Sequence, residues 1–372
     1  FISLGLPDGL LGSGWPMMHA ELDVPVSAAG IVSMIICIGT IVSSLMSERL
    51  THKLGPGKVT AISVATTAIA LFGFAFSNSF WMLCLWAIPY GLGAGSVDAS
   101  LNNYVAVHYA SRHMSWLHCM WGVGASIGPY IMGFCLSGGQ HWSMGYRYVG
   151  IVQIVLTAIL LLSLPIWNGR TDTSEAKSGT PLSLRQALRV PGAKEVMITF
   201  FCYCSLEQTA GLWAASYLTL HAGLSVEAAA SFASLFFLGI TAGRAISGFV
   251  TMKLNDTQMI HLGMGIIAAG IATLLLPLGA YGAMAGLLLV GLGCAPIYPC
   301  IMHSTPDLFG ADKSQALIGI QTASAYVGTA LMPPFFGLLA DYLSISLLGL
   351  FLLVMLILMF LTYQRMLQKC AR

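Results

Sequence analysis

Acidic and amide side chains occur inside the most apolar stretches of this chain. Asp98 and Asn102 lie four residues apart in the segment "GLGAGSVDASLNNYVAV". Residues at positions i and i+4 share one face of a helix, so this carboxylate and this amide point the same way. Asp8 and Glu207 occupy comparable apolar stretches. Burial raises the pKa of a carboxyl group toward neutrality, which suits it to loading and unloading a proton. We therefore expect Asp98, Asp8 and Glu207 to be proton-coupling residues, which take up and release a proton as a solute moves.

Other polar side chains in these stretches offer what a sugar requires. Amides supply paired donors and acceptors for hydroxyl groups, and aromatic rings cover the C–H face of a sugar ring. The residues expected to bind a substrate are Asp8, Asn102, Asn103, His118, Trp121, Glu207, Gln208, Trp213, Tyr298 and Gln321. Structural roles stay open for them, because amides also join membrane helices by hydrogen bonds. Trp15 is interpreted as an interface anchor and His303 as a helix-packing residue.

The composition requires most of the chain to face lipid. Of 372 residues, 57% are hydrophobic and only 8% are charged, with a mean hydropathy of +0.81. Soluble domains have roughly a quarter of their residues charged, so this chain does not have enough polar side chains to cover itself in water. The net charge of +2 gives no reason to expect a nucleic-acid partner. The nine cysteines form no CxxC pair, so neither a metal site nor a disulfide framework is expected.

Apolar runs long enough to cross a bilayer, about 20 residues each, occur twelve times. They start near Phe1, Pro25, Val59, Phe80, His113, Gly145, Lys194, Val226, Thr257, Tyr281, Lys313 and Ile345. The polar stretch "WNGRTDTSEAKSGTPLSLRQALRV" separates the first six from the last six. We predict an all-α integral membrane protein of twelve transmembrane helices, with a six-helix bundle at 1–166, a cytoplasmic linker at 167–193 and a second six-helix bundle at 194–372.

The basic residues fall on one side of these alternating spans. Arg49, Lys53 and Lys58 follow the second span, and further Lys and Arg occupy the central linker and the C-terminal tail. Arg147 is the one basic residue on the opposite side. By the positive-inside rule, both termini and the central loop are expected to be cytoplasmic. Because the first residue already lies in an apolar stretch, we expect a short natural N-terminal segment to precede it.

The two halves of the chain resemble each other at three places in the same order. "HAELDVPVSAAG" pairs with "HAGLSVEAAASF", "YGLGAGS" with "VGLGCAP", and "GASIGPYIMGF" with "GTALMPPFFGL". Internal repeats of this kind are typical of transporters that rock one half against the other around a central site. The repeat therefore predicts two bundles related by pseudo-two-fold symmetry, with a substrate site reached alternately from each side.

The twelve-span layout resembles the major facilitator superfamily over the whole chain. "SERLTHKLGPGK" is similar to a degraded form of the motif that this superfamily has in its loop between spans two and three. Glu48 and Arg49 fill its acid–Arg positions, and the resemblance implies a role in gating. Arg244, in "GRAISG", is expected to pair with a carboxylate or with carbonyl groups in a gate.

Within that superfamily, the fourth span resembles the fucose:proton symporter family. The pattern is Gly-Leu-Gly-x-Gly-x-x-acid-x-x-x-Asn, which here ends in Asp98 and Asn102. The resemblance implies that Asp8, in the first span, handles substrate and proton and that Asp98 carries the coupling proton. Two departures are an Asp where the family has Glu in the fourth span and the additional acid Glu207.

We therefore expect proton-coupled symport of a small neutral solute, a hexose or deoxyhexose, by alternating access. Proton-coupled efflux of drugs or metabolites is the alternative, because "GASIGP" resembles the core of an antiporter motif in the fifth span. Sodium-coupled sugar uptake is a third reading, since carboxylate and carbonyl oxygens also suit Na⁺. No arrangement of nucleophile and base supports an enzyme, and no cofactor is expected. We expect a monomer in a bacterial inner membrane.

Overall fold

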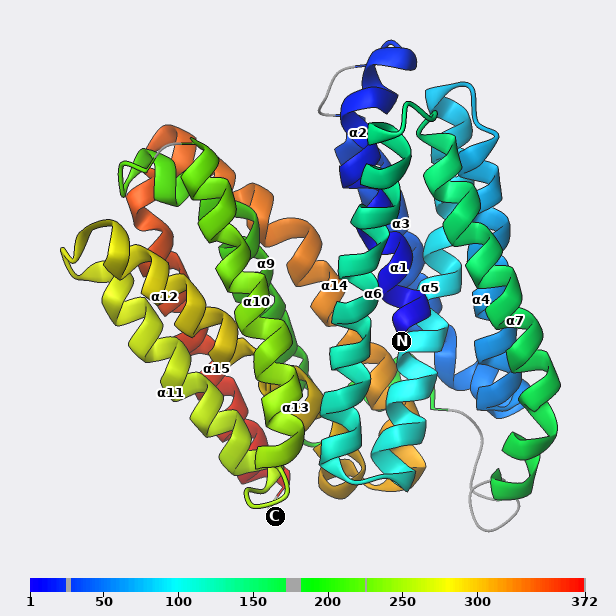
Figure 1. The fold of residues 1–372 in the computed structure, drawn as a ribbon. Coiled ribbons are helices and arrows are strands. Elements are labelled where there is room, and N and C mark those ends of the chain that lie inside the picture. The colour runs from blue at the N-terminus through cyan, green and yellow to red at the C-terminus, as the bar shows by residue number, and fades with distance from the viewer. Residues whose placement is uncertain (25–27, 172–181, 225, 371–372) are drawn as a thin grey trace. The chain divides into compact units, whose positions relative to one another are not determined.

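The computed structural model describes residues 1–24, 28–171, 182–224 and 226–370, which are helical almost throughout and contain no strand (Figure 1). The elements in these ranges are α1 (Ile2–Asp8), α2 (Leu10–Glu21), α3 (Ala29–Leu54), α4 (Pro56–Ala75), α5 (Phe80–His108), α6 (Ser111–Ser137), α7 (Ser143–Thr171), α8 (Leu184–Ala187), α9 (Ala193–Leu220), α10 (Val226–Val250), α11 (Asp256–Leu275), α12 (Gly279–Cys294), α13 (Ile297–Phe309), α14 (Ala311–Tyr342), the 3₁₀ turn η2 (Ile345–Leu347) and α15 (Leu348–Cys370). The all-α prediction is confirmed.

Helices occupy all twelve stretches predicted to span a membrane. In the described residues, nine helical stretches are long and apolar enough to cross a bilayer. The first predicted span is divided into α1 and α2, and the tenth is divided into α12 and α13. The short helix α8 lies in the predicted linker, of which residues 172–181 are outside the described ranges.

The helices form two compact units. Unit 1 comprises Phe1–Tyr104, Met120–Leu184 and Asp312–Ala323; unit 2 comprises Val105–Cys119, Arg185–Ala311 and Ser324–Arg372. The predicted boundaries at 1–166, 167–193 and 194–372 follow from the polar stretch between the sixth and seventh spans, and they stay a prediction.

The core of unit 1 is built from large side chains of α2, α4, α5 and α7. Trp142 and Leu10 are fully buried in it, and Phe74 is 2% exposed. Phe74 stacks on Tyr146, with ring centroids 5.3 Å apart. Trp15 belongs to the same cluster and is only 4% exposed. Trp15 is therefore a core residue, and its interpretation as an interface anchor was wrong.

Close contacts between helix backbones repeat in the two units. A Cβ atom added to Gly91 of α5 would lie 2.2 Å from the carbonyl oxygen of Ile36 in α3. One added to Gly291 of α12 would lie 2.2 Å from the carbonyl oxygen of Phe236 in α10. Only glycine permits either approach, and small residues are what allow membrane helices to pack this closely. The matched segments "YGLGAGS" and "VGLGCAP" thus play the same packing role, each in its own unit.

Hydrogen bonds set the rotation of α5 against α3. The hydroxyl oxygens of Ser43 and Ser96 lie 2.6 Å apart, and the backbone N–H of Ser96 donates to Ser43 Oγ at 3.0 Å. Thr40 donates its hydroxyl to the carbonyl oxygen of Gly91 at 3.3 Å. Because Asp98 follows Ser96 by two residues on the same helix, this contact determines which way its carboxylate points.

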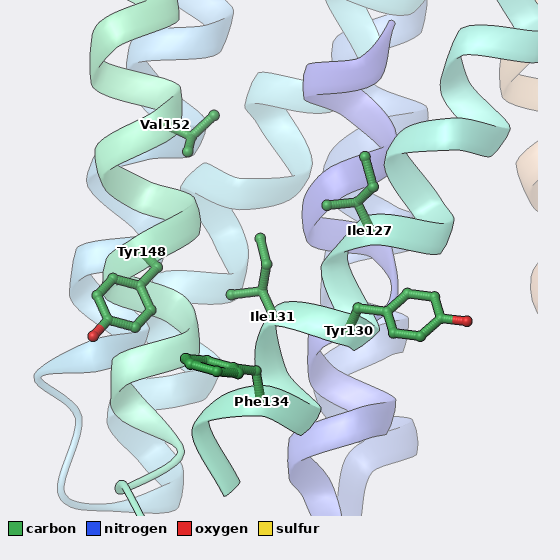
Figure 2. A pocket seen from close by; sticks show the side chains of 6 residues that line it. All are labelled: Ile127, Tyr130, Ile131, Phe134, Tyr148 and Val152. Carbon is green, nitrogen blue, oxygen red and sulfur yellow. The ribbon is translucent and has the colours of Figure 1, made fainter. Parts of the chain in front are cut away.

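A groove of apolar side chains lies between α6 and α7 in unit 1, as Figure 2 shows. Its lining consists of Ile127, Tyr130, Ile131, Phe134, Tyr148 and Val152. Tyr130 and Phe134 are 79% and 72% exposed, as expected for side chains that face lipid. None of the residues predicted to bind substrate or proton lines this groove.

The Gly91 contact predicts a steep cost for adding one methyl group. Gly91→Ala would drive Cβ into the backbone of α3, which has no side-chain freedom with which to move away, so we expect a markedly lower melting temperature or loss of the folded protein. Gly133→Ala is the matched control, since a Cβ there meets nothing within 4 Å and alanine favours helix by about 1 kcal/mol. Thermal unfolding in detergent measures both, and equal melting temperatures would contradict the packing argument.

Candidate functional site

Asp8 lies at a break in the first membrane helix of unit 1. It is the last residue of α1, and α2 begins two residues later at Leu10. Pro7 lies inside the last turn of α1, where its ring supplies no backbone N–H. The Asp8 side chain is exposed, whereas Pro7 before it and Leu10 after it are buried. Interrupted membrane helices of this kind frequently form the substrate and ion sites of transporters.

Two aromatic side chains donate hydrogen bonds to the Asp8 carboxylate. Trp121 Nε1, from α6, donates to Oδ2 at 2.9 Å. The Tyr90 hydroxyl, from α5, donates to Oδ1 at 3.4 Å, and the Tyr90 side chain is 8% exposed. The indole hydrogen bond has the ordinary length of an N–H···O hydrogen bond. Each carboxylate oxygen of Asp8 therefore has one donor from a different helix.

The segment "GASIGP" brings α6 against α1 so that Trp121 reaches Asp8. A Cβ atom on Gly124 would lie 2.3 Å from the carbonyl oxygen of Ile2, and one on Gly128 would lie 2.1 Å from that of Leu6. The two glycines thus form a packing face one and two turns beyond Trp121. This packing accounts for the short motif that resembles the antiporter core.

Asp98 and Asn102 form the pair that their spacing predicts. The Asn102 amide donates to Asp98 Oδ1 at 2.9 Å. Asp98 is 8% exposed and Asn102 is fully buried. Asp98 also interacts electrostatically with Asp8, and both acids lie in unit 1. Among the described residues, no Lys, Arg or His side chain lies within 4.0 Å of Asp98.

Asn103 points to a different neighbour. Its side-chain oxygen accepts a hydrogen bond from Ser314 of α14, which belongs to unit 1. Gln315, the next residue, donates to Ser47 Oγ at 3.3 Å. Asn103 therefore joins two helices through its side-chain oxygen. Its predicted part in substrate binding depends on its amide nitrogen.

The predicted gating residues of the loop motif are placed at the end of α3. Glu48 is half-buried and accepts a hydrogen bond from the backbone N–H of Leu182 at 3.0 Å. Arg49 is exposed. The contact ties the end of α3 to the segment before α8, and the gating role of both residues stays a prediction.

The third acid lies in unit 2 and has a charged partner. Glu207 of α9 and Arg244 of α10 form an ion pair with 3.7 Å between Oε1 and Nη2, and their side chains are 9% and 5% exposed. Arg244 thus pairs with a carboxylate, as expected. Glu207 differs from Asp98 because its charge is balanced by a neighbouring cation.

The aromatic residues predicted to bind substrate in unit 2 divide into two groups. His118 and Tyr298 are in edge contact, with ring centroids 5.0 Å apart, and Phe200 contacts Tyr298 at the same distance. Trp213 instead donates its indole N–H to the carbonyl oxygen of Pro333 at 3.0 Å and packs on Phe336. Trp213 is thus used in helix packing.

The two glutamines predicted to bind substrate differ in exposure and lie in different units. Gln208, next to Glu207 on α9, is half-buried, whereas Gln321 of α14 belongs to unit 1 and is fully buried. The structure therefore places Asp8, Asp98, Asn102, Asn103, Trp121 and Gln321 in unit 1. It places Glu207, Gln208, Trp213, Arg244, His118 and Tyr298 in unit 2.

Sequence reasoning missed Tyr90 and a second polar cluster. Tyr90 opens the segment "YGLGAGS", in which the glycines carried the predicted resemblance. In unit 2, Asp256 at the start of α11 receives hydrogen bonds from Ser111 and from His303 Nδ1, the latter at 2.6 Å. The carbonyl oxygen of Tyr109 lies 2.8 Å from His303 Nε2. His303 is thus a satisfied packing residue, as interpreted, although its partners were not foreseen.

Comparison with known proteins identifies the family. The sequence profile described as the Major Facilitator Superfamily matches residues 1–302 and 196–367. The chain belongs to the Major Facilitator Superfamily. It is 24% identical over 363 residues to the uncharacterized transporter y4wD of Sinorhizobium fredii, covering 92% of this chain and 89% of that protein. It is 23% identical to Bypass of stop codon protein 6 of Saccharomyces cerevisiae, of which the chain spans just over half the length, 56%.

Solved structures show the same fold. FucP, the E. coli fucose:proton symporter, matches in its outward conformation with a TM-score of 0.79 and 14% identity, covering 98% of this chain and 96% of FucP. The proton:xylose symporter XylE, bound to 6-bromo-6-deoxy-D-glucose, matches with a TM-score of 0.81 and 13% identity, covering 98% and 93%. The family match and the apolar helices make the chain a multi-pass membrane protein of this transporter superfamily.

The Trp121 hydrogen bond predicts a specific defect at Asp8. Trp121→Phe keeps an aromatic ring but removes the indole donor, so we expect substrate affinity to fall about tenfold, because a hydrogen bond to a charged group is worth about 1.5–3 kcal/mol. Trp142→Phe is the matched control, since it removes an indole donor to the carboxylate of Glu21 at 2.7 Å. Binding titrations of the purified variants compare the two, and an equal loss in both would show that the effect is one of general stability.

Proposed function

We propose that this transporter is a proton-coupled symporter of a small neutral solute, with a monosaccharide as the substrate. The observation that carries the proposal is the environment of Asp98. Its carboxyl group is almost fully buried among membrane helices, and its hydrogen-bond partner is the neutral amide of Asn102. A buried carboxylate without a cation is neutralised by taking up a proton, so Asp98 is the group best suited to bind one.

Comparison with Glu207 supports this assignment. Both acids are buried, but Arg244 balances the charge of Glu207. Among the described residues, Asp98 has no Lys, Arg or His side chain within 4.0 Å. The additional acid in the seventh span thus differs in kind from the coupling acid, and we assign the coupling proton to Asp98.

Asp8 is the second working group in this proposal. Its exposed carboxylate is positioned by Trp121 and Tyr90 and interacts electrostatically with Asp98. Because the two carboxyl groups interact, binding of a substrate at Asp8 would change how tightly Asp98 holds its proton. This link makes solute binding and proton binding depend on each other, as coupled transport requires.

A hydroxylated substrate is supported by the chemistry around Asp8. A carboxylate accepts hydrogen bonds from hydroxyl groups, an indole ring offers a flat face, and the amide of Asn102 offers both donor and acceptor. FucP, a fucose:proton symporter, and XylE, a proton:xylose symporter, have the same fold, which agrees with this proposal. Efflux of apolar drugs is less consistent with a site in which both oxygens of Asp8 are already held in place by aromatic donors.

The role of Asp98 is tested by separating accumulation from exchange. Asp98→Asn keeps the size of the side chain but removes the titrating group, so we expect it to abolish uptake driven by a pH gradient while exchange of labelled sugar for unlabelled sugar continues. Asp312→Asn, at an exposed residue, is the control. Both reactions are measured in proteoliposomes.

Accumulation by Asp98→Asn with an unaltered dependence on the pH gradient would refute the assignment. Accumulation driven only by a sodium gradient in the wild type would favour the sodium-coupled alternative.

The role of Asn102 is tested by affinity. If this buried amide hydrogen-bonds a sugar hydroxyl, Asn102→Ala leaves one group of the complex unpaired and weakens binding by roughly 1–3 kcal/mol. The loss should be smaller for the analogue that lacks that hydroxyl, which a panel of deoxy sugars identifies in binding titrations. Unchanged affinity across the whole panel would remove Asn102 from the binding site.

A further inference from the structure

A buried amide side chain lies in α7, a helix that otherwise faces lipid over much of its length. Gln153 is fully buried, whereas Ile151 and Val155 on the same helix are 51% and 54% exposed. Val152, the residue before it, lines the apolar groove of Figure 2. Burying an amide costs free energy unless the amide is hydrogen-bonded. The polar atoms of Gln153 therefore need partners on a neighbouring helix.

Both polar atoms of this amide bind one residue of α1. Gln153 Nε2 donates to the backbone carbonyl oxygen of Ser3 at 2.5 Å, and the Ser3 hydroxyl donates to Gln153 Oε1 at 2.8 Å. Because a carbonyl oxygen can only accept a hydrogen bond, the amide nitrogen is the atom that faces it. Ser3 is itself buried, and both residues belong to unit 1. The amide thus clamps the backbone and the side chain of Ser3 together.

Pro7 explains why the carbonyl oxygen of Ser3 takes its partner from another helix. In an α-helix, the N–H of residue i+4 donates to the carbonyl oxygen of residue i. Pro7 lies four residues after Ser3 inside α1 and has no N–H to donate. Gln153 therefore supplies the hydrogen bond that the proline removes from α1.

The same clamp sets the direction in which Asp8 points. Ser3 and Pro7 are four residues apart, so they share the face of α1 that meets α7. One residue turns a helix by about 100°, so Asp8 points away from this face, to its indole donor Trp121 on α6. A Cβ atom added to Gly5 would lie 2.1 Å from the carbonyl oxygen of Trp121. The helix α1 is thus held between α7 and α6.

We propose that Gln153 is a positioning residue of the site at Asp8. By completing the hydrogen bonding that Pro7 interrupts, it holds the end of α1 in the orientation in which Trp121 and Tyr90 reach the Asp8 carboxylate. Gln153 acts through the backbone of α1. The inference rests on the proposed role of Asp8 in binding a solute and adds the residue that keeps this site in its binding geometry.

The orientation of the carboxylate is measured at its indole partner, without a solute or a gradient. The chain is labelled with fluorotryptophan and purified in detergent, and the fluorine NMR resonance of Trp121 is identified by its loss in Trp121→Phe. Gln153→Leu removes both hydrogen bonds to Ser3. We expect this variant to shift or broaden the Trp121 resonance, because the end of α1 is no longer fixed against α7.

The matched control is another amide that joins two helices. Gln364 of α15 lies 2.6 Å from Nε2 of His261 in α11, and both residues belong to unit 2. Gln364→Leu removes a comparable hydrogen bond from the protein. It should lower the melting temperature but leave the Trp121 resonance as in the wild type.

A conservative variant separates hydrogen bonding from the filling of space. Gln153→Glu keeps the shape of the side chain, and its protonated carboxyl group offers one donor and one acceptor, as the amide does here. In acidic buffer it should therefore give the Trp121 resonance of the wild type in the same buffer. Gln153→Met fills the space without a donor and should behave like Gln153→Leu.

Pro7→Ala tests why the clamp is needed. This change returns an N–H to the position that faces the Ser3 carbonyl oxygen, so the amide of Gln153 becomes less necessary. We expect Gln153→Leu to lower the melting temperature less in the Pro7→Ala background than in the wild-type background. Comparing the two differences removes the effect of alanine itself, which favours a helix. If Gln153→Leu alone does not fold, folding of the double variant shows the same dependence, and its failure to fold contradicts it.

Binding titrations connect the clamp with the proposed function. Gln153→Leu should weaken monosaccharide binding about tenfold, the loss expected when a hydrogen bond to Asp8 is lost, whereas Gln364→Leu should bind as the wild type does. Absence of sugar binding in the wild type would contradict the proposed function. The fluorine resonance and the melting temperatures decide the present inference in that case, because neither needs a substrate.

Four results would overturn the inference. The first is a Trp121 resonance that is unchanged in Gln153→Leu or that changes equally in Gln364→Leu. The second is that Gln153→Met preserves this resonance as well as Gln153→Glu does. The third is an equal loss of melting temperature from Gln153→Leu with and without Pro7→Ala. The fourth is unchanged sugar affinity in Gln153→Leu.

Discussion

The cost of an uncompensated charge among lipid-embedded helices governs how the acidic residues of this transporter are arranged. Three carboxylates meet that cost in three ways. Asp8 is exposed and receives hydrogen bonds from Trp121 and Tyr90. Glu207 is paired with Arg244. Asp98 is buried beside a neutral amide, so a proton is the partner that it lacks. Different environments thus give residues of one chemical type different tasks.

The lipid environment also explains why so many glycines occur at the helix contacts that position these acids. Lipid offers no hydrophobic drive for two apolar helices to associate, so their contact depends on close packing and on hydrogen bonds between helices. Gly91 brings α5 onto α3, and Gly124 and Gly128 bring α6 onto α1. The first contact orients Asp98, and the second brings Trp121 to Asp8. The site that we propose in unit 1 therefore depends on residues that themselves carry no functional group.

The internal repeat conserves packing more than it conserves chemistry. Gly291 repeats the role of Gly91, and Gly328, whose Cβ would lie 2.6 Å from the carbonyl oxygen of Phe201, repeats that of Gly124. The acids do not follow this pattern. Where unit 1 has Asp98 two residues after its glycine segment, unit 2 has Tyr298 two residues after its own, and the buried acid of unit 2 lies on α9 instead. An inherited framework of close helix contacts thus holds different chemistry in the two units.

Helical segments and the pairing of Asp98 with Asn102 were determined by the sequence alone, because an apolar run of about 20 residues spans a bilayer and positions i and i+4 meet on any helix. The repeated glycine segments were also found from the sequence alone, because glycine is identified by its residue type without knowledge of its neighbours. Partners on different helices were decided only by the tertiary structure. Trp121 meets Asp8, and Arg244 meets Glu207, across large separations in the chain. Such contacts depend on how each helix is rotated and how closely it packs, and local spacing carries no information about either.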